Sequence, residues 1–567
     1  MTMLADKFIP LSTALRETLS RGYSVKTFGQ DALAALIVSM VALPLSMALA
    51  IAVGLPPQYG LYTAIVAGIT VPLLGGSVTQ VSGPTAAFVV ILAPLVTQFG
   101  LRGIILAEMM AGVMLLMLAW ARLGKFINFV PYPVSTGFTA AIAVVLGTLS
   151  LNDLLGLGVE KLQGSYIDKV ILLASHVPGL RWPEACIGLL SLVIMFTGKR
   201  ITSKVPSVVL GIGAGTLLAM IFQHTGISVA TLGNQFSYEV GGITGHGIPP
   251  FPPSFHFFSS KGFFAWPTYL ELKTLMMPAF VIAVLAALES LLSATVSDGM
   301  ARTRHNPNAE LAALGIGNIL CGFASGIPAT GAIARTTTNI KSGGKTPLAS
   351  SMHAVLIMLY VLALAPVIDR IPMASLAALL VLTAYNMSHY RQFYRILTIA
   401  PRQDIIVLLV CFGLTVFIDM VAGVSVGIGL AALLFIQRMS AITEGQVHET
   451  IEAGSLPPNV LLYRISGPLF FATVERTLDR TAFLRNHIDT LIFDLREVPL
   501  IDMTGLVALK NLLTGDALSG KKVVLCGRPD ILHKIMQKLA SEKQINVRMA
   551  ASVEEALAGL TPTASAV

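Results

Sequence analysis

Two short segments bring together residue types that can bind an anion without a metal or a cofactor. Gly75–Phe88 reads GGSVTQVSGPTAAF, and Cys321–Ala334 reads CGFASGIPATGAIA. Each passes through Ser-Gly and Pro, reaches Thr and continues into small residues typical of a helix. Proline suits the first turn of a helix, because the N–H group that it lacks would be unpaired there. We therefore expect each segment to be extended chain that becomes the start of a helix.

A helix that starts inside a membrane offers free N–H groups and roughly half an elementary positive charge. Two such starts facing one another would form a site for an anion. The alternative is a pair of ordinary Gly/Pro kinks, whose backbone groups neighbouring membrane helices can satisfy. The matched pattern favours the anion site, since paired Gly/Pro-interrupted segments are typical of binding sites between inverted repeats.

Arg335 lies about two helical turns after Pro328. An arginine buried in a membrane is costly and usually marks a substrate pathway. It could lie beneath the anion and strengthen the local positive field. It could equally extend to the cytoplasmic face, where the polar run Thr336–Lys341 follows, and the sequence leaves both possibilities open.

Glu289 stands in the middle of the apolar stretch Met277–Met300, with Ser293 one turn later on the same helical face. A carboxylate out of water tends to take up a proton. Glu289 is therefore a candidate proton carrier, because its protonation would remove its repulsion of a bound anion. The alternative is a glutamate bonded permanently to a serine or to the backbone. Glu108 is the rival acid, and it ranks second because it lies closer to the end of its apolar segment.

Other motifs do not support chemistry. The run GGKT at Gly343–Thr346 lacks the first glycine of a phosphate-binding loop, since that position holds Asn339. The four cysteines are scattered and give neither a disulfide framework nor metal-ligand spacing. We find no Ser/His/Asp or His/Glu set placed for catalysis, so we expect no enzyme, no metal and no cofactor.

The composition shows where these residues lie. The chain of 567 residues is 54% hydrophobic and 12% charged, whereas soluble proteins carry roughly a quarter charged residues. The mean hydropathy is +0.76. Ala32–Leu101 contains no Asp, Glu, Lys or Arg, which is enough for more than one crossing of about 20 residues. The sequence therefore predicts an integral membrane protein.

Basic residues indicate the orientation of the spans. Pairs of apolar segments separate successive basic clusters, and the connections inside each pair are poor in Lys and Arg. Because loops rich in Lys and Arg stay in the cytoplasm, the pattern predicts roughly 14 spans with both termini in the cytoplasm. The net charge of +8 follows from this asymmetry, so we do not expect nucleic-acid binding. The clusters are Arg16–Lys26, Ala121–Lys125, Gly198–Lys204, Met300–His305, Lys341–Lys345, His389–Arg395 and Gln437–Arg438.

The pattern changes near Ser440. We expect a cytoplasmic N-terminal segment over residues 1–30, a transmembrane domain over 31–440, a cytoplasmic α/β domain over 441–560 and a tail over 561–567. Alternation of β-rich runs with amphipathic helices predicts the α/β domain. Its predicted strands are Asn459–Ile465, Thr490–Leu495 and Lys521–Gly527, and its predicted helices are Thr473–Asn486, Thr504–Leu513 and Pro529–Lys543.

The whole chain resembles the sulfate permease (SulP) family of anion transporters. Leu43–Gly68, the run VSGPTAAFVV at Val81–Val90 and Thr336–Ser350 carry the resemblance. The cytoplasmic part is similar to the STAS domain of that family, with IDMTGL at Ile501–Leu506 in place of its D-x-[ST]-G turn. Within the bacterial members, QYGLYTA and SGPTAAFVVIL are most similar to the DauA-type transporters of four-carbon dicarboxylates.

The resemblance implies a 7+7 inverted repeat divided into a core domain and a gate domain. The core would carry the anion between spans three and ten and move like an elevator against the gate. Glu289 and Ser293 fall where sodium-coupled bicarbonate members use Asp and a hydroxyl residue, and Glu resembles the proton-coupled branch. The positions that would face or support the substrate are Thr85, Ala86, Phe88, Thr330, Gly331, Ile333, Ala334 and Arg335.

The resemblance also bears on regulation and assembly. The hydroxyl residue of the D-x-[ST]-G turn is phosphorylated in some STAS domains, and here it is Thr504. The alternative is that Thr504 caps the helix that follows. Family members are usually dimers, so we expect a homodimer, with an unknown partner for the cytoplasmic domain.

These observations predict a proton-coupled transporter of small dicarboxylates such as succinate, fumarate or aspartate in a bacterial inner membrane. An inorganic-anion carrier for bicarbonate or sulfate is the alternative within the class. A membrane sensor that signals through the STAS domain is the alternative from another class.

Overall fold

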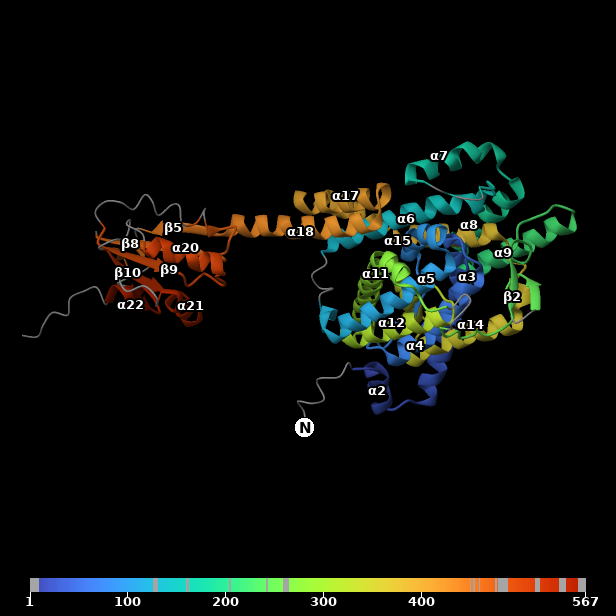
Figure 1. Ribbon diagram of the computed structural model, residues 1–567, viewed down its shortest axis with the longest axis horizontal. Helices are drawn as coiled ribbons and strands as arrows, with labels where there is room; N and C mark the ends of the chain where they lie inside the picture. Colours follow the sequence, from blue (N-terminus) through green and yellow to red (C-terminus); the bar gives the residue numbers. More distant parts are fainter. Residues whose placement is uncertain are drawn as a thin grey trace, which may run out of the picture. The chain divides into compact units, whose positions relative to one another are not determined.

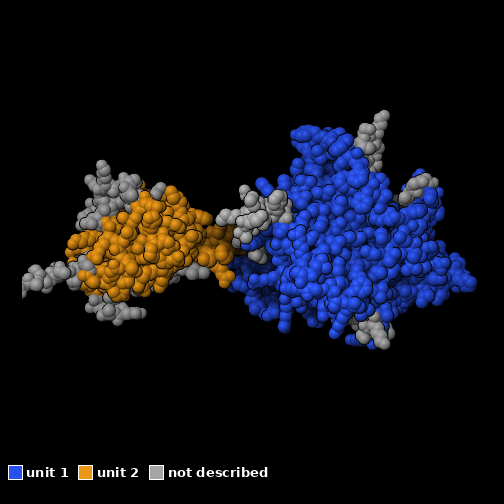
Figure 2. All heavy atoms as spheres, turned by 90° about the horizontal axis from the view of Figure 1, so that it is seen from below, with its two compact units in different colours: residues 1–428 blue, residues 429–567 orange. Residues whose placement is uncertain are grey.

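The computed structural model describes residues 10–125, 131–159, 162, 164–202, 205–240, 243–258, 265–448, 450–451, 454–457, 459–474, 477, 488–514, 521–539 and 547–558. The chain forms two compact units, residues 1–428 and residues 429–567, which Figure 2 distinguishes by colour. The boundary falls inside helix α18 (Met420–Ile442), and the sheet of the second unit begins after that helix.

The first unit is built almost entirely of helices (Figure 1). Glycine or proline at their ends accounts for many of the boundaries, as at Gly54, which ends α3 in the left-handed conformation with φ 92°. The helices are α2 (Thr13–Ser20), α3 (Val25–Val53), α4 (Pro57–Leu74), η1 (Ala86–Phe88), α5 (Val89–Trp120), α6 (Tyr132–Leu155), α7 (Tyr166–His176), η3 (Val177–Gly179), α8 (Trp182–Ile201), α9 (Ser207–His224), α10 (Leu232–Gln235), α11 (Tyr269–Ala301), α12 (Pro307–Phe323), α13 (Ile333–Lys341), α14 (Pro347–Ile368), α15 (Met373–Met387), α16 (Tyr390–Ile399) and α17 (Arg402–Phe417).

The helices are compatible with the predicted number of spans. Among the described residues, seven helices are long and apolar enough to cross a membrane, and α7 with α8 forms a pair bent by 114°. Helix α5 holds two segments, because Gly100 inside it has φ 62° and ψ −169°. If α4, α12, α13, α15 and α17 are counted as well, the described helices are compatible with fourteen segments.

The packing of the segments follows a 7+7 inverted repeat. Helix α5 packs on α12 as α14 packs on α4, and α5 packs on α11 as α14 packs on α3. In the same way α6 packs on α17 as α15 packs on α8. In each comparison, a helix of the first half that packs on a helix of the second half is matched by the corresponding helices with the halves exchanged. A repeat of seven spans requires this pairing.

The same contacts divide the unit into two groups of helices. One group, which we call the core, contains α3, α4, α5, α11, α12, α13 and α14. The other, the gate, contains α6, α8, α9, α15 and α17, and Figure 1 shows α6, α8, α15 and α17 gathered together. A hairpin of β2 (Ser237–Val240) and β3 (Ile243–His246) precedes α11.

The second unit is a five-stranded sheet with helices, in the order β11-β10-β9-β8-β5. Strands β8, β9, β10 and β11 are parallel neighbours, and β5 joins β8 antiparallel. The elements are β5 (Glu444–His448), β6 (Thr450–Ile451), β7 (Gly454–Ser455), β8 (Val460–Ser466), β9 (Thr490–Asp494), α20 (Met503–Thr514), β10 (Lys522–Cys526), α21 (Pro529–Leu539), β11 (Val547–Ala550) and α22 (Val553–Ala558).

All three predicted strands of this domain are present as β8, β9 and β10. The predicted helices at Thr504–Leu513 and Pro529–Lys543 correspond to α20 and α21, whereas most of the one predicted at Thr473–Asn486 lies outside the described residues, as does the predicted tail. The sequence reading missed the edge strands β5 and β11. Neither has a run of β-branched or aromatic residues, since β5 reads EGQVH and β11 reads VRMA.

Candidate anion site between two broken spans

The two Gly/Pro segments meet in the middle of the core. Strand β1 (Ser82–Gly83) pairs antiparallel with β4 (Thr330–Gly331), with Ser82 opposite Gly331 and Gly83 opposite Thr330. Helices η1 and α5 follow β1, and α13 follows β4 within two residues. Because the strands run in opposite directions, the two helices leave the pair in opposite directions and both N-termini flank it.

Neither helix start is capped by a side chain. The residues before them, Thr85 and Ala332, are extended, and neither start has a side-chain hydrogen bond to its first N–H groups. The predicted role of the prolines is wrong, because neither occupies a first helical turn. Pro84 precedes Thr85, and Pro328 lies before β4. They keep the chain extended ahead of each helix, since proline disfavours helical conformation in the residue that precedes it.

Glycine permits the close approach of the two segments. A Cβ atom on Gly83 would overlap the guanidinium of Arg335, and one on Gly331 would overlap the amide of Gln80. That amide donates from Nε2 to Ser290 Oγ at 2.7 Å, so it is held in place by α11. The pair of strands therefore depends on the absence of side chains at both positions.

Glu289 lies directly beside the first helix start. The hydroxyl of Thr85 donates a hydrogen bond from Oγ1 to Glu289 Oε2 at 2.9 Å. Glu289 is half-buried. The structure thus places the acid of α11 at the residue that precedes η1, although 204 positions separate them in sequence.

Ser293 faces a different part of the site. Its Oγ lies 3.3 Å from Thr336 Oγ1, and Thr336 Oγ1 accepts a hydrogen bond from Val81 N at 3.0 Å. Ser293 and Thr336 are both fully buried. They connect α11 to α13 and to the chain that enters β1.

Arg335 is buried, with 1% of its surface exposed. Its Nη2 donates to Pro84 O at 2.7 Å, while Nε and Nη1 have no hydrogen-bond partner within the described part of the chain. No described carboxylate lies within ion-pair distance of it. Extension of Arg335 to an aqueous face, the alternative that the sequence left open, is therefore wrong. Its charge stays between the two broken spans.

The predicted substrate positions differ in their access to solvent. Ala334 is exposed, and Thr85 and Ile333 are half-buried. Thr330 is fully buried, and its hydroxyl donates to Ala286 O at 3.0 Å, so it braces β4 against α11. Buried positions that shape the site from behind are Ala86, Phe88 and Gly331.

Two polar residues that the sequence analysis overlooked brace the second segment. Thr63 Oγ1 of α4 donates to Ile327 O at 2.9 Å and accepts from Ile327 N at 2.7 Å. Asn318 of α12 accepts from Ala329 N at 2.9 Å and donates to Ala329 O at 3.1 Å. Both could have been predicted from the sequence as bracing residues, because a Thr or an Asn inside an apolar helix needs a hydrogen-bond partner at membrane depth.

Glu108, the rival acid, makes no hydrogen bond to the broken spans within the described residues. It is fully buried in α5, and neither carboxylate oxygen has a hydrogen-bond partner among the described residues. A buried carboxylate is costly as an anion unless it is paired. No hydrogen bond in the described part of the chain connects Glu108 to the two helix starts.

In the second unit, the helix cap is Asp502 and not Thr504. Asp502 Oδ1 accepts a hydrogen bond from Gly505 N at 2.7 Å, and its Oδ2 accepts from Phe471 N at 3.1 Å. Thr504 is exposed in the first turn of α20. The capping interpretation of Thr504 is wrong, and its hydroxyl remains accessible.

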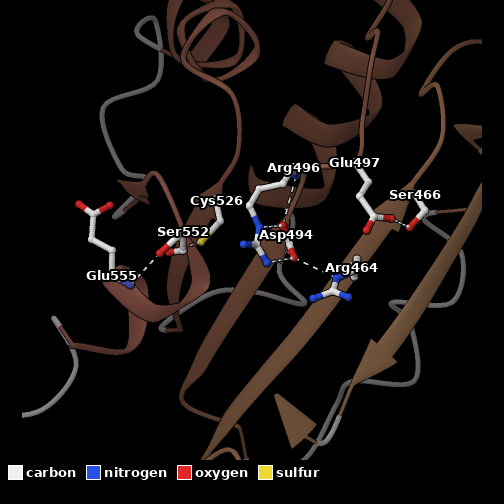
Figure 3. Close-up of polar contacts among 8 residues, drawn as sticks. All are labelled: Arg464, Ser466, Asp494, Arg496, Glu497, Cys526, Ser552 and Glu555. Carbon is white, nitrogen blue, oxygen red and sulfur yellow. Dashed lines mark hydrogen bonds and ion pairs between the residues drawn. The ribbon is translucent and has the colours of Figure 1, made fainter. Parts of the chain in front are cut away.

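Asp494 anchors the carboxyl ends of the parallel strands of this unit. Figure 3 shows it between two arginines, with Arg464 Nε donating to Oδ2 at 3.0 Å and Arg496 Nε donating to Oδ1 at 2.9 Å. Burial alone would raise the pKa of Asp494, but the bonds from Arg496 and Arg464 outweigh it and hold that pKa below its usual range. The network ties β8 to β9.

Comparison with known proteins matches both units. The family model described as Sulfate permease family matches residues 28–411, and the model of the STAS domain matches residues 455–556. A putative sulfate transporter, YvdB of Bacillus subtilis, is 36% identical over 525 residues that cover 91% of this chain and 95% of the relative. The bicarbonate transporter BicA of Picosynechococcus is 27% identical and covers 91% of each chain.

Solved structures show the same fold. The structure of SLC26A9 matches with a TM-score of 0.82 at 18% identity, covering 98% of this chain and 93% of that one. The transmembrane domain of a cyanobacterial BicA matches with a TM-score of 0.59 at 24% identity, covering 72% of this chain and 98% of that one. The fold is thus that of a helical membrane transporter with a STAS domain.

Proposed function

Since the chain belongs to the sulfate permease family, we propose that it is a secondary transporter that carries a small anion together with a proton. One arrangement supports this proposal above all others. Glu289 accepts a hydrogen bond from the residue that precedes an uncapped helix start, and Arg335 lies buried between the two broken spans.

The helix starts and Arg335 supply binding. Uncapped N–H groups and the helix dipole attract a negative charge, and the guanidinium adds a full positive charge nearby. None of these groups requires a metal or a cofactor. Their chemistry suits a carboxylate, a bicarbonate or a sulfate.

Glu289 supplies coupling to H⁺ in this proposal. A charged Glu289 repels an anion bound at the neighbouring helix start, whereas a protonated Glu289 does not. Binding of a proton therefore favours binding of the anion, and by linkage the anion favours the proton to the same extent. Movement of the core against the gate would then carry both across the membrane.

We propose small dicarboxylates, such as succinate, fumarate and aspartate, as substrates, since motifs resembling DauA-type transporters surround the site. Sulfate and bicarbonate are the second candidates, and the transport functions for which two relatives are named favour them. The likeness to the DauA type rests on motifs alone, because the relatives compared above are named for sulfate and bicarbonate.

The orientation and assembly belong to the same proposal. The distribution of basic residues supports cytoplasmic termini in a bacterial inner membrane. A homodimer remains our expectation from the family, as does a cytoplasmic partner of the STAS domain near the accessible Thr504.

Counterflow in proteoliposomes tests the proposal. Purified protein is reconstituted with unlabelled succinate, fumarate, aspartate, sulfate or bicarbonate inside, and uptake of labelled anion is measured with and without an inward pH gradient. We expect counterflow of at least one anion, accelerated by the gradient. A sensor that signals through the STAS domain would bind an anion in a thermal-shift screen and show no counterflow with any of the five.

A further inference from the structure

A hollow of about 630 Å³ opens in the first unit, and none of the candidate anion-site residues lines it. Four cationic side chains line it, from three parts of the chain: Arg21 at the end of α2, Arg302 and Arg304 after α11, and Lys345 before α14. The carboxylate in its lining is Glu17, which pairs with Arg21. The hollow is therefore strongly positive.

The other cations lack an acidic partner. Arg302, Arg304 and Lys345 are exposed, and none has a carboxylate within ion-pair distance in the described ranges. The two neighbouring carboxylates serve other groups. Asp298 accepts from His305 and Thr303, and Asp31 accepts from the backbone N–H of Lys345 and from Thr346.

A second hollow of about 360 Å³ adjoins the first, since Glu17 and Arg304 line both. It adds Lys125 to the positive surface. Basic loops alone would satisfy the positive-inside rule. That rule gives no reason, however, for cations from separate parts of the chain to converge on one cavity.

We infer that this hollow binds a phosphate-bearing anion. Arginine presents a planar fork of N–H donors that matches phosphate oxygens, and lysine adds a point charge. Basic pockets between helices on the cytoplasmic side of a membrane bind the headgroups of anionic lipids. The same chemistry would hold a soluble phosphate, so the source must be decided by experiment.

The position of the hollow connects it to the anion site. Val78, in its lining, lies four residues before β1, and Lys345 lies four residues after the end of α13. Asn306 N also donates to Gly76 O at 3.1 Å, which joins the loop after Arg304 to the entry of the first broken span. An occupant therefore touches the flanks of both broken spans.

Equilibrium binding to the full-length protein in detergent tests the inference. The probes are dioctanoyl phosphatidylglycerol for the lipid source, pyrophosphate for the soluble source and dioctanoyl phosphatidylcholine as a zwitterionic control. We expect saturable binding of phosphatidylglycerol if the natural ligand is a lipid headgroup, or of pyrophosphate if it is a soluble phosphate. Added salt should weaken this binding. The double variant R302Q/R304Q should weaken that binding by about tenfold or more, because hydrogen bonds to charged groups are strong.

The matched control is R395Q/R402Q, which removes the same charge from exposed arginines outside the hollow. It should change the affinity by less than about twofold, since surface charges at a distance are largely screened. All replaced side chains are exposed, and unfolding temperatures without a probe verify the fold. Equal losses in the two variants, equal binding of phosphatidylcholine, or no saturable binding of either phosphate probe would overturn the inference.

Discussion

Thr85 Oγ1 donates to Glu289 Oε2 at 2.9 Å, and this bond joins the first broken span to the acid of α11. The hydroxyl of Thr85 would ordinarily cap the helix that follows it. Here it turns to the carboxylate and leaves the first N–H groups uncapped. In the proposed mechanism, Thr85 is the residue through which protonation of Glu289 would be coupled to occupation of the helix start.

Glu289→Gln should keep anion exchange and lose its acceleration by an inward pH gradient. Glutamine preserves the size of the side chain and can still accept from Thr85, but it carries no titratable proton. The measurement is counterflow of labelled anion in proteoliposomes at equal pH and with the interior more alkaline.

Glu108→Gln is the matched control, since it makes the same substitution in a second glutamate of a membrane helix, whose carboxylate has no hydrogen-bond partner among the described residues. We expect its gradient response to equal that of the wild type. Coupling through Glu289 would be excluded if the gradient still accelerated uptake by Glu289→Gln as in the wild type.

Arg335→Ala should weaken the binding of sulfate or succinate more than the binding of bicarbonate. A unit charge about 6 Å away at an effective dielectric constant of 20 contributes about 3 kcal/mol per charge on the anion. We therefore expect the dianion to lose at least about tenfold more affinity than the monoanion. Titrations of purified protein measure both.

Arg335→Lys separates charge from geometry, because lysine keeps the positive charge without the guanidinium fork that reaches Pro84 O. Relative to Arg335→Ala, the Arg335→Lys variant should regain part of the affinity difference between dianions and monoanions. Equal losses for sulfate and bicarbonate in Arg335→Ala would show that Arg335 only braces the first segment.

The Gly/Pro patterns of residues 75–88 and 321–334 predicted that two broken spans meet, because such breaks are costly in lipid unless they form a site. The partner of Arg335 could not be predicted in the same way. It is the backbone oxygen of Pro84, 251 positions away, and every residue carries such an oxygen. The positions of Pro84 and Pro328 could not be predicted either. Proline is tolerated both next to a short strand and in the first turn of a helix, so the sequence does not distinguish the two.

Gly331→Ala should abolish transport with little loss of expression. The added methyl group would overlap the amide of Gln80, which Ser290 holds in place, so β4 must move away from β1. Gly213→Ala is the control, because no described atom outside the adjoining backbone of α9 lies within 4 Å of the new methyl group. Its transport should be unchanged and its stability about 1 kcal/mol higher, as alanine favours a helix over glycine. Normal uptake by Gly331→Ala would contradict the close approach of the two strands.

Asp502→Ala should destabilise the STAS domain by about 1 kcal/mol, because it removes the cap of α20. Thr504→Ala should change stability by less than about 0.5 kcal/mol, since Thr504 is exposed and does not cap. Denaturant unfolding of the two variants compares them directly. A larger loss of unfolding free energy from Thr504→Ala than from Asp502→Ala would show that Thr504 caps α20.

Asp494 should make the free energy of unfolding of the same domain depend on pH in the acidic range. Its pKa in the folded state lies below its usual value, so the folded state binds its proton less readily than the unfolded chain. The stabilisation is therefore complete above the unfolded value of about 3.9 and declines as the pH falls through the folded value. Asp494→Asn should lower the unfolding temperature at pH 7, because Arg464 and Arg496 lose their charged acceptor, and should reduce the further decline between pH 5 and about pH 3. Thermal unfolding scans over that pH range measure both effects. If the unfolding temperature of Asp494→Asn still fell with pH as steeply as that of the wild type, the decline would come from other carboxylates.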